Sequence, residues 1–192
     1  MFPTPEPDRL AARSATTGVC RPKCIIVIGP ESSGSKLAAK VCAHALGVHA
    51  FGTWNAVGWT DGCKSGHRVC HRSLPYGTGA QFPDLGSMIA EHRDRYDIRF
   101  ILTTRDRTLS ELSRRARFGK SAHQVSHESD RATTIVKSIL RSEWPSFLWS
   151  YETFMMLGKD YLDLLYRFLG TDSDFVPELR DGNAERLRHG LA

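Results

Sequence analysis

The sequence predicts an α/β fold in which helices cover both faces of a parallel β-sheet. Short β-branched runs at 24–29 and 98–104 have the composition of buried parallel strands, and segments with helical spacing of apolar residues follow them. Strands that alternate with helices are joined by right-handed crossovers. Because 192 residues with 41% hydrophobic content are enough for one core, we expect a single domain over 23–192 behind a flexible tail at 1–22.

The first half of the chain contains a strand–loop–helix unit. The strand at 24–29 is followed by a helix at roughly 35–46, in which apolar side chains recur at helical spacing, and Gly47 supplies a left-handed cap. Residues 48–66 lack a clear period and are expected to form a loop. The remaining expected elements are a short strand at 67–70, an irregular segment from 71 onward that contains Pro and Gly, and a helix near 85–96.

The second half repeats the alternation. The strand at 98–104 leads into a helix over 105–119, with Leu109, Leu112 and Ala116 on one face and Gly119 as its stop. The remaining expected elements are a polar loop at 120–129, a helix at about 130–142, a strand at 146–151 after Pro145, and a helix at about 155–169 that places Tyr161, Leu164, Leu165 and Phe168 at helical spacing before Gly170.

The composition restricts the class of partner. A net charge of +5 and a pI near 9.1 suit an anionic ligand, but not the dense basic face of a nucleic-acid binder. No run approaches the roughly 18–20 apolar residues of a membrane span, and the N-terminus lacks the layout of a secretion signal. Five cysteines, an odd number, do not suggest a disulfide framework. We therefore expect a soluble cytoplasmic protein without nucleic-acid or membrane partners.

The stretch GPESSGSK at 29–36 is similar to a nucleotide P-loop whose lysine is displaced. Gly29 and Gly34 have the P-loop spacing, but Ser35 takes the lysine position and Lys36 takes the position of the hydroxyl that binds Mg²⁺. The fold is therefore expected to be P-loop-like, and the loop argues against a magnesium triphosphate.

The backbone of this loop can bind an anion even though the P-loop lysine is displaced. Consecutive N–H groups from Ser33 to Leu37 at a helix start form an anion site that needs no metal. The alternative is a turn rich in Gly and Ser in which Ser32 or Ser33 only caps the helix.

Several ordered motifs give the chain a family resemblance. With these motifs the chain resembles the sulfotransferase family, in particular small sulfotransferase-like proteins whose loop reads GPESSGT followed by a basic residue. The resemblance spans about residues 24–170. The motifs are GPESSGSK, HRSLPYG, FPDL, TTRDRTLSELS after a strand, and SYETF followed by a helix that ends in FLG.

The resemblance implies a sulfotransferase-like fold and a donor, 3'-phosphoadenosine 5'-phosphosulfate (PAPS). In the family, a lysine stands just before the Ser-Gly pair of the loop, where this chain has Ser32, so Lys36 is expected to supply that charge. The residues implied to grip the 5'-phosphosulfate are Ser32, Ser33, Gly34, Ser35, Lys36 and Leu37.

The family also holds the 3'-phosphate with an Arg at a strand end and a Ser eight residues later, a spacing that Arg105 and Ser113 share. The planar guanidinium of Arg105 suits phosphate, and Ser113 adds a hydroxyl two helical turns further along. The alternatives are an ion pair of Arg105 with Asp106 or another carboxylate, and a solvated helix serine at Ser113.

Sulfuryl transfer needs in-line geometry and stabilisation of the leaving oxygen, and a metal is dispensable. Lys36 is the candidate for the leaving-group charge. His71 is the candidate base because imidazole titrates near neutral pH, although it can equally be a buried structural histidine. Arg72 would orient an acidic acceptor or the sulfonate, and Asp84 is a second candidate base that can equally be a turn or cap residue.

Four potential metal ligands gather at Cys63, His67, Cys70 and His71. Structural zinc sites usually keep two ligand pairs further apart, so we expect no metal. A disulfide between Cys63 and Cys70 is an alternative.

The leading hypothesis from the sequence is a PAPS-dependent sulfotransferase acting on a hydroxyl or amine of a small-molecule or carbohydrate acceptor. One alternative is a P-loop kinase that uses ATP. Another is a non-catalytic module that binds a nucleotide or a sulfated glycan. The sequence specifies neither the acceptor nor the oligomeric state.

Overall fold

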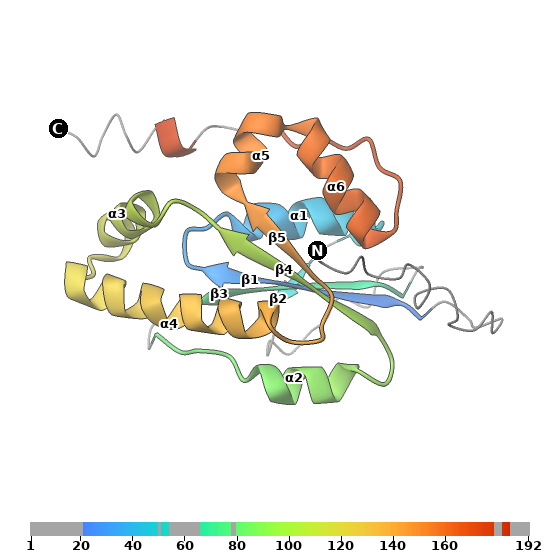
Figure 1. The fold of residues 1–192 in the computed structure, drawn as a ribbon, viewed down its shortest axis with the longest axis horizontal. Helices are drawn as coiled ribbons and strands as arrows, with labels where there is room; N and C mark the ends of the chain where they lie inside the picture. Colours follow the sequence, from blue (N-terminus) through green and yellow to red (C-terminus); the bar gives the residue numbers. More distant parts are fainter. Residues whose placement is uncertain (1–20, 50, 54–65, 78–79, 179–181, 185–192) are drawn as a thin grey trace, which may run out of the picture.

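The computed structural model describes residues 21–49, 51–53, 66–77, 80–178 and 182–184. Within them a five-stranded sheet has the order β2-β3-β1-β4-β5, and every neighbouring pair is parallel (Figure 1). The elements are β1 Lys23–Pro30, α1 Ser35–Ala45, β2 Gly52–Thr53, β3 Arg68–Leu74, α2 Leu85–His92, β4 Asp97–Thr104, α3 Arg107–Phe118, α4 Ala122–Leu140, β5 Ser146–Ser150, α5 Tyr151–Leu157 and α6 Lys159–Leu169.

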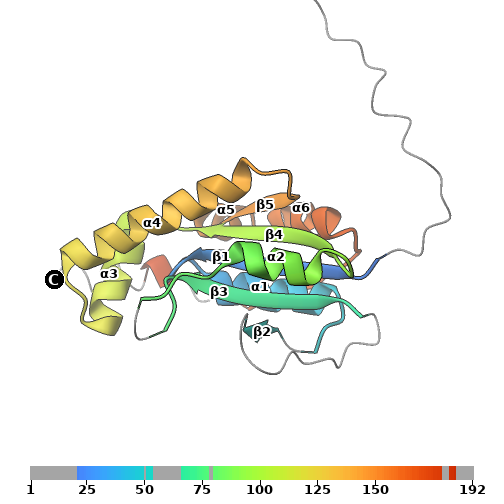
Figure 2. The same cartoon turned by 90° about the horizontal axis from the view of Figure 1, so that it is seen from below.

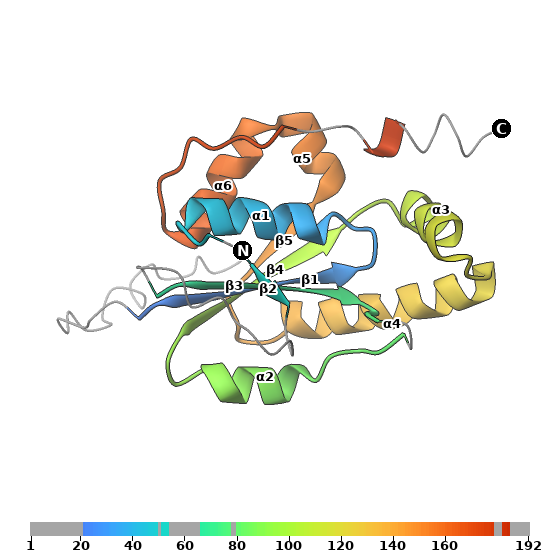
Figure 3. The same ribbon diagram turned by 180° about the vertical axis from the view of Figure 1, so that it is seen from behind.

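Helices cover both faces of the sheet, which confirms the predicted α/β class. Alternate residues of β1 point to opposite faces, because side chains alternate along a strand. Ile25 and Val27 pack with α1, α5 and α6, whereas Ile26 and Ile28 pack with α2 and α4. Figure 3 shows the same two layers from behind.

Loops that follow parallel strands emerge at one edge of the sheet, and α3 lies at this edge. In Figure 2, α3 and the start of α4 extend past the carboxyl ends of the strands. The loop between β1 and α1 faces them, and Ser110 of α3 donates a hydrogen bond to the carbonyl of Glu31 at 3.1 Å. This arrangement brings the predicted anion loop against α3.

Two predictions about the strands were wrong. Strand β3 continues through Leu74, so His71 and Arg72 lie within it rather than in the irregular segment after it. The extension follows from pairing with β1, since Val27 lies opposite His71 and Ile28 opposite Arg72. Short strand β2 occupies part of the expected loop at 48–66, beside β3.

Three predictions about the helices were wrong. The buried face of α3 contains Ser110, Ser113 and Arg114, whereas Leu112 is exposed. Helix α4 begins at Ala122, within the expected polar loop. The expected helix at 155–169 is two helices, α5 and α6, which meet at Gly158.

Several expectations fall partly outside the described residues. One is the tail, of which the structure describes residues 21 and 22. Another is the proposed ligand set, whose Cys63 lies outside the described residues. In the part of the chain that the structure describes, no helix combines the length and apolar character that a bilayer crossing needs.

Candidate anion-binding site

A cavity of about 410 Å³ opens at the carboxyl edge of the sheet. It brings together most of the residues that the sequence predicted to bind the donor: Ser32, Gly34, Ser35, Lys36, Arg105 and Ser113. A larger hollow of about 610 Å³ is lined by Asp163, Asp172 and Asp174 near the end of α6. Those carboxylates do not suit an anion, so the smaller cavity is the better candidate.

The loop after β1 presents an uncapped helix start. Gly34 is the N-cap of α1 with a left-handed backbone (φ 84°), and no side chain caps the helix. The amides of Ser35, Lys36 and Leu37 occupy its first turn, where backbone N–H groups have no partner within a helix. Positive partial charge at such an end attracts anions. Lys36, exposed at the cavity wall, adds a full charge.

Ser32 and Ser33 do not cap the helix, in contrast to the alternative drawn from the sequence. The N–H of Ser33 donates to the carbonyl of Pro30 at 3.1 Å, so the expected row of free amides begins at Gly34. The Ser33 hydroxyl is 2.6 Å from that of Thr103. The buried Ser32 Oγ has no partner among the described residues, although Ser32 lines the cavity.

Arg105 lies directly behind the loop. Its Nη1 donates to the carbonyl of Ser32 at 3.1 Å, its Nε donates to Asn183 Oδ1 at 2.7 Å, and its guanidinium lies 4.9 Å from the centre of the Tyr151 ring. Nη2 is buried and has no partner within the described part of the chain. Arg105 does not form the ion pair with Asp106 that the sequence left as an alternative. Asp106 instead caps α3 by accepting a hydrogen bond from the N–H of Leu109.

Ser113 is buried rather than solvated, with 7% of its surface exposed. It lines the same cavity as Arg105 and the loop. The two parts of the predicted donor site therefore face one space.

His71 is placed behind Ser35, outside the residues that line the cavity. Its Nε2 is 2.8 Å from Ser35 Oγ, and Nδ1 has no partner among the residues described. Burial, followed by the charges of Lys36 and Arg72, lowers the pKa of His71 to about 4. The ring is therefore neutral at pH 7 and meets the cavity through the Ser35 hydroxyl.

Arg72 is likewise not among the cavity residues. Its guanidinium lies 4.1 Å from the centre of the Tyr76 ring, and its buried Nε has no partner in the described segments. Asp84 accepts a hydrogen bond from the N–H of Ser87 at 3.1 Å and is the N-cap of α2. Asp84 is therefore a helix-capping residue, which was the alternative to a catalytic base.

The described part of the expected ligand cluster is occupied by other contacts. His67 Nδ1 accepts a hydrogen bond from the N–H of Lys23 at 2.9 Å, and Cys70 is a buried free thiol whose Sγ is 3.5 Å from the carbonyl of Ile25. No group of three or more potential ligands gathers among the described residues, and Cys63 lies outside them.

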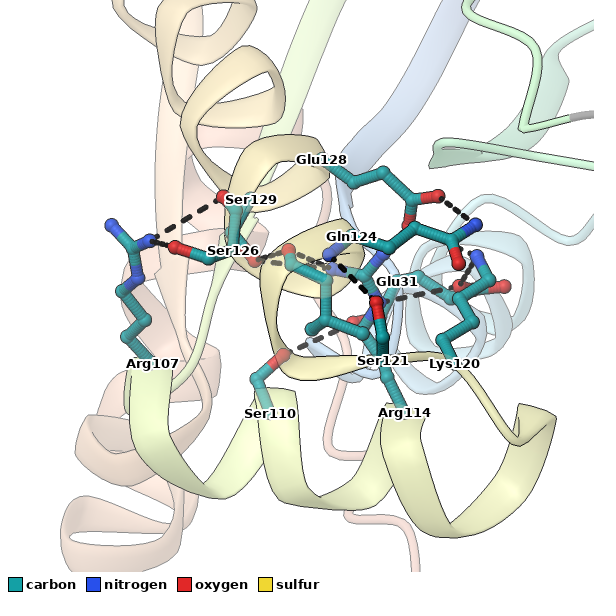
Figure 4. Close-up of polar contacts among 11 residues, drawn as sticks. Glu31, Arg107, Ser110, Arg114, Lys120, Ser121, Gln124, Ser126, Glu128 and Ser129 are labelled. Carbon is teal, nitrogen blue, oxygen red and sulfur yellow. Dashed lines mark hydrogen bonds and ion pairs between the residues drawn. The ribbon is translucent and has the colours of Figure 1, made fainter.

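Sequence reasoning missed a charged cluster beside the loop (Figure 4). The Glu31 carboxylate lies 3.3 Å from Arg114 and 3.5 Å from Lys120, and both cations also pair with Glu128. Arg114 is fully buried. Nothing in the local pattern marks it, because a helix is expected to bury apolar side chains.

Sequence reasoning also missed Ser73, Arg117 and Phe118 as cavity residues. For Arg117 a signal was available, since it follows Ser113 by four residues on one helix.

A scan of the chain against protein-family models gives no match, and a search of curated proteins gives no significant match. The resemblance to sulfotransferases therefore rests on the motifs themselves.

Proposed function

We propose that this chain is a PAPS-dependent sulfotransferase with a sulfotransferase-like fold, which transfers a sulfuryl group to a hydroxyl or amine. One observation carries the proposal: the loop amides of α1 and the Arg105–Ser113 pair line the same cavity. PAPS has two anionic groups at opposite sides of its ribose, and the cavity offers donors for each. No metal is required by these contacts.

The same cavity is poorly arranged for ATP with magnesium. The position of the P-loop lysine is Ser35, whose hydroxyl is hydrogen-bonded to His71. The Glu31 carboxylate is the acidic group of the cavity, and it is already paired with Arg114 and Lys120. A hard divalent cation therefore finds no uncommitted carboxylate among the described lining residues.

In the proposed reaction the acceptor oxygen attacks sulfur while the bond from sulfur to the 5'-phosphate oxygen breaks. Adenosine 3',5'-bisphosphate leaves, and Lys36 with the α1 amides stabilises the charge on its 5'-phosphate. The acceptor proton passes to Ser35 Oγ as Ser35 gives its own proton to His71 Nε2.

A second candidate, a non-catalytic binding module, is favoured by the placement of His71. An imidazole with a pKa of about 4, hidden behind Ser35, is a weak base. The module would bind the nucleotide and transfer nothing.

Isothermal titration with adenosine 3',5'-bisphosphate, compared with ATP plus Mg²⁺, tests the donor class. We expect the bisphosphate to bind more tightly, and Arg105→Ala to weaken it roughly 10- to 100-fold because a charge-assisted hydrogen bond is lost. Arg115→Ala, an exposed change on α3 away from the cavity, is the matched control. Tighter binding of ATP with Mg²⁺ would remove the proposal.

Transfer of labelled sulfate from PAPS to a panel of hydroxyl and amine acceptors separates the enzyme from the module. If the chain is an enzyme, the wild type should transfer sulfate to an acceptor, and the rate should fall in His71→Gln. Binding of the bisphosphate with no transfer to any acceptor supports the module instead.

A further inference from the structure

Arg117 shares a helix face with Ser113. The two residues are four apart on α3, so their side chains lie one above the other, and both line the cavity at the end of β1. Phe118 follows at the cavity edge, with 44% of its surface exposed. The cavity wall beside Ser113 is therefore both cationic and aromatic.

Arg117 differs from Arg107 and Arg114 of the same helix in having no acidic partner among the described residues. Arg107 pairs with Glu111 and Asp130, and Arg114 pairs with Glu31 and Glu128. The guanidinium of Arg117 lies 5.2 Å from the centre of the Phe118 ring, and no described carboxylate is within ion-pair distance of it.

The cationic character of the cavity depends on how Glu31 is held. Its carboxylate is drawn towards α3 and α4 by Arg114 and Lys120, which compensate its charge (Figure 4). The remaining charged groups of the described cavity wall are Lys36, Arg105 and Arg117. Lys36 belongs to the loop end, so the two arginines remain for a second anion.

Arg105 alone leaves that second anion short of donors. Hydrogen bonds to Asn183 and to the Ser32 carbonyl occupy its Nε and Nη1, and Nη2 is the nitrogen without a partner. A phosphate dianion has three terminal oxygens and accepts several charge-assisted hydrogen bonds. A second guanidinium on the Ser113 face would supply the missing donors.

We propose that Arg117 is a phosphate-binding residue that completes, with Arg105 and Ser113, the subsite for the ribose-borne phosphate of the ligand. This inference rests on the proposed function, because it assigns the second anion to a nucleoside 3',5'-bisphosphate. Arg117 then selects ligands that carry this phosphate over nucleoside 5'-monophosphates, which engage only the loop and Lys36.

Titrations of Arg117→Gln with adenosine 3',5'-bisphosphate and with adenosine 5'-monophosphate test the inference. We expect roughly 10- to 100-fold weaker binding of the bisphosphate and a change below about twofold for the monophosphate. Arg117→Lys keeps the charge but not the planar fork, and should recover part of the loss. Arg115→Gln, on the same helix but outside the cavity, should bind both ligands as the wild type does.

The outcomes separate this inference from the proposed function. Unchanged bisphosphate affinity in Arg117→Gln, while Arg105→Ala still loses it, overturns the role of Arg117 alone. Equal losses for both ligands also overturn it, because the effect is then not specific to the second phosphate. Failure of the wild type to prefer the bisphosphate over the monophosphate overturns both proposals.

Discussion

The imidazole of His71 is enclosed between β3, the start of α1 and Phe51. It is 5% exposed, its ring centre lies 6.0 Å from that of Phe51, and the charges of Lys36 and Arg72 act on it. Burial first, and then the charges of Lys36 and Arg72, disfavour the protonated ring. The folded chain therefore holds His71 neutral over most of the range in which an unfolded histidine titrates.

This placement predicts a pH-dependent stability. The pKa of His71 is about 4 in the folded chain and near 6.5 when unfolded, so as pH falls the unfolded chain takes up the proton first. The His71 contribution to the free energy of unfolding is complete above about pH 6.5, falls by about 2 kcal/mol by about pH 5, and is fully lost below about pH 4.

Urea unfolding of the wild type and of His71→Gln, each at about pH 7.5 and about pH 5, measures this term. The wild type should lose about 2 kcal/mol more than the variant between the two values. The pKa of His67 is also lowered, by burial and by Lys23, but it contributes equally to both proteins. Equal pH dependence in the two proteins would show that His71 is not held neutral.

Gly34 shows how one residue sets the geometry of the loop. Its φ of 84° strains any residue with a Cβ, and a Cβ there would also approach Cδ2 of Tyr151 to 3.1 Å. The P-loop spacing of Gly29 and Gly34 in the sequence indicated that Gly34 belongs to an anion loop. The contact with Tyr151, the first residue of α5, could not be predicted from the residues around Gly34.

At the scale of elements, the pair of helices α3 and α4 is held together by charge. Arg114 is fully buried and joins Glu31 of the loop to Glu128 of α4, with Lys120 beside them (Figure 4). This pairing explains both errors about these helices. The search for an apolar helix face predicted that Leu112 is buried and that the polar residues 120–129 form a loop. In the structure the residues buried between α3 and α4 include charged and polar side chains.

Replacing Arg114 by Met should destabilise the protein by about 3–5 kcal/mol, because among the described residues the carboxylates of Glu31 and Glu128 would then share one cation, Lys120. Arg115→Met, an exposed change on the same helix, should stay within about 0.5 kcal/mol. Urea unfolding at neutral pH measures both.

The double variant Arg114→Met with Glu128→Gln provides the internal check. It should lose less than the sum of the two single changes, because the second removes a carboxylate that the first left unpaired. A cost below about 1 kcal/mol for Arg114→Met alone would mean that the cluster does not hold the helices.

At the scale of the whole molecule, the parallel sheet gathers segments that are distant in sequence. The loop after β1, the end of β4 and helix α3 meet at one edge because all five strands run the same way. A ligand that bridges these segments binds only the folded chain. Its binding therefore stabilises the whole molecule by mass action.

Thermal unfolding in adenosine 3',5'-bisphosphate should show this linkage. At about 100 times the dissociation constant the stabilisation is about 2.7 kcal/mol, or roughly 5–10 °C for a domain of this size. Arg105→Ala should show a much smaller rise at the same ligand concentration. A similar rise in that variant would mean that the ligand binds elsewhere.

The sequence alone was enough to predict the α/β class and the first strand and helix with its glycine cap, and its resemblance to sulfotransferases pointed to the loop, Arg105 and Ser113. The elements follow from local periodicity, and the rule that parallel strands end at one edge places the loop and the end of the 98–104 strand together. The folded structure was needed to place His71 within β3 behind Ser35 and to show that Arg114 is buried with Glu31 and Glu128. The physical reason is that burial, ion pairing and strand extension depend on partners distant in sequence, which local spacing does not encode.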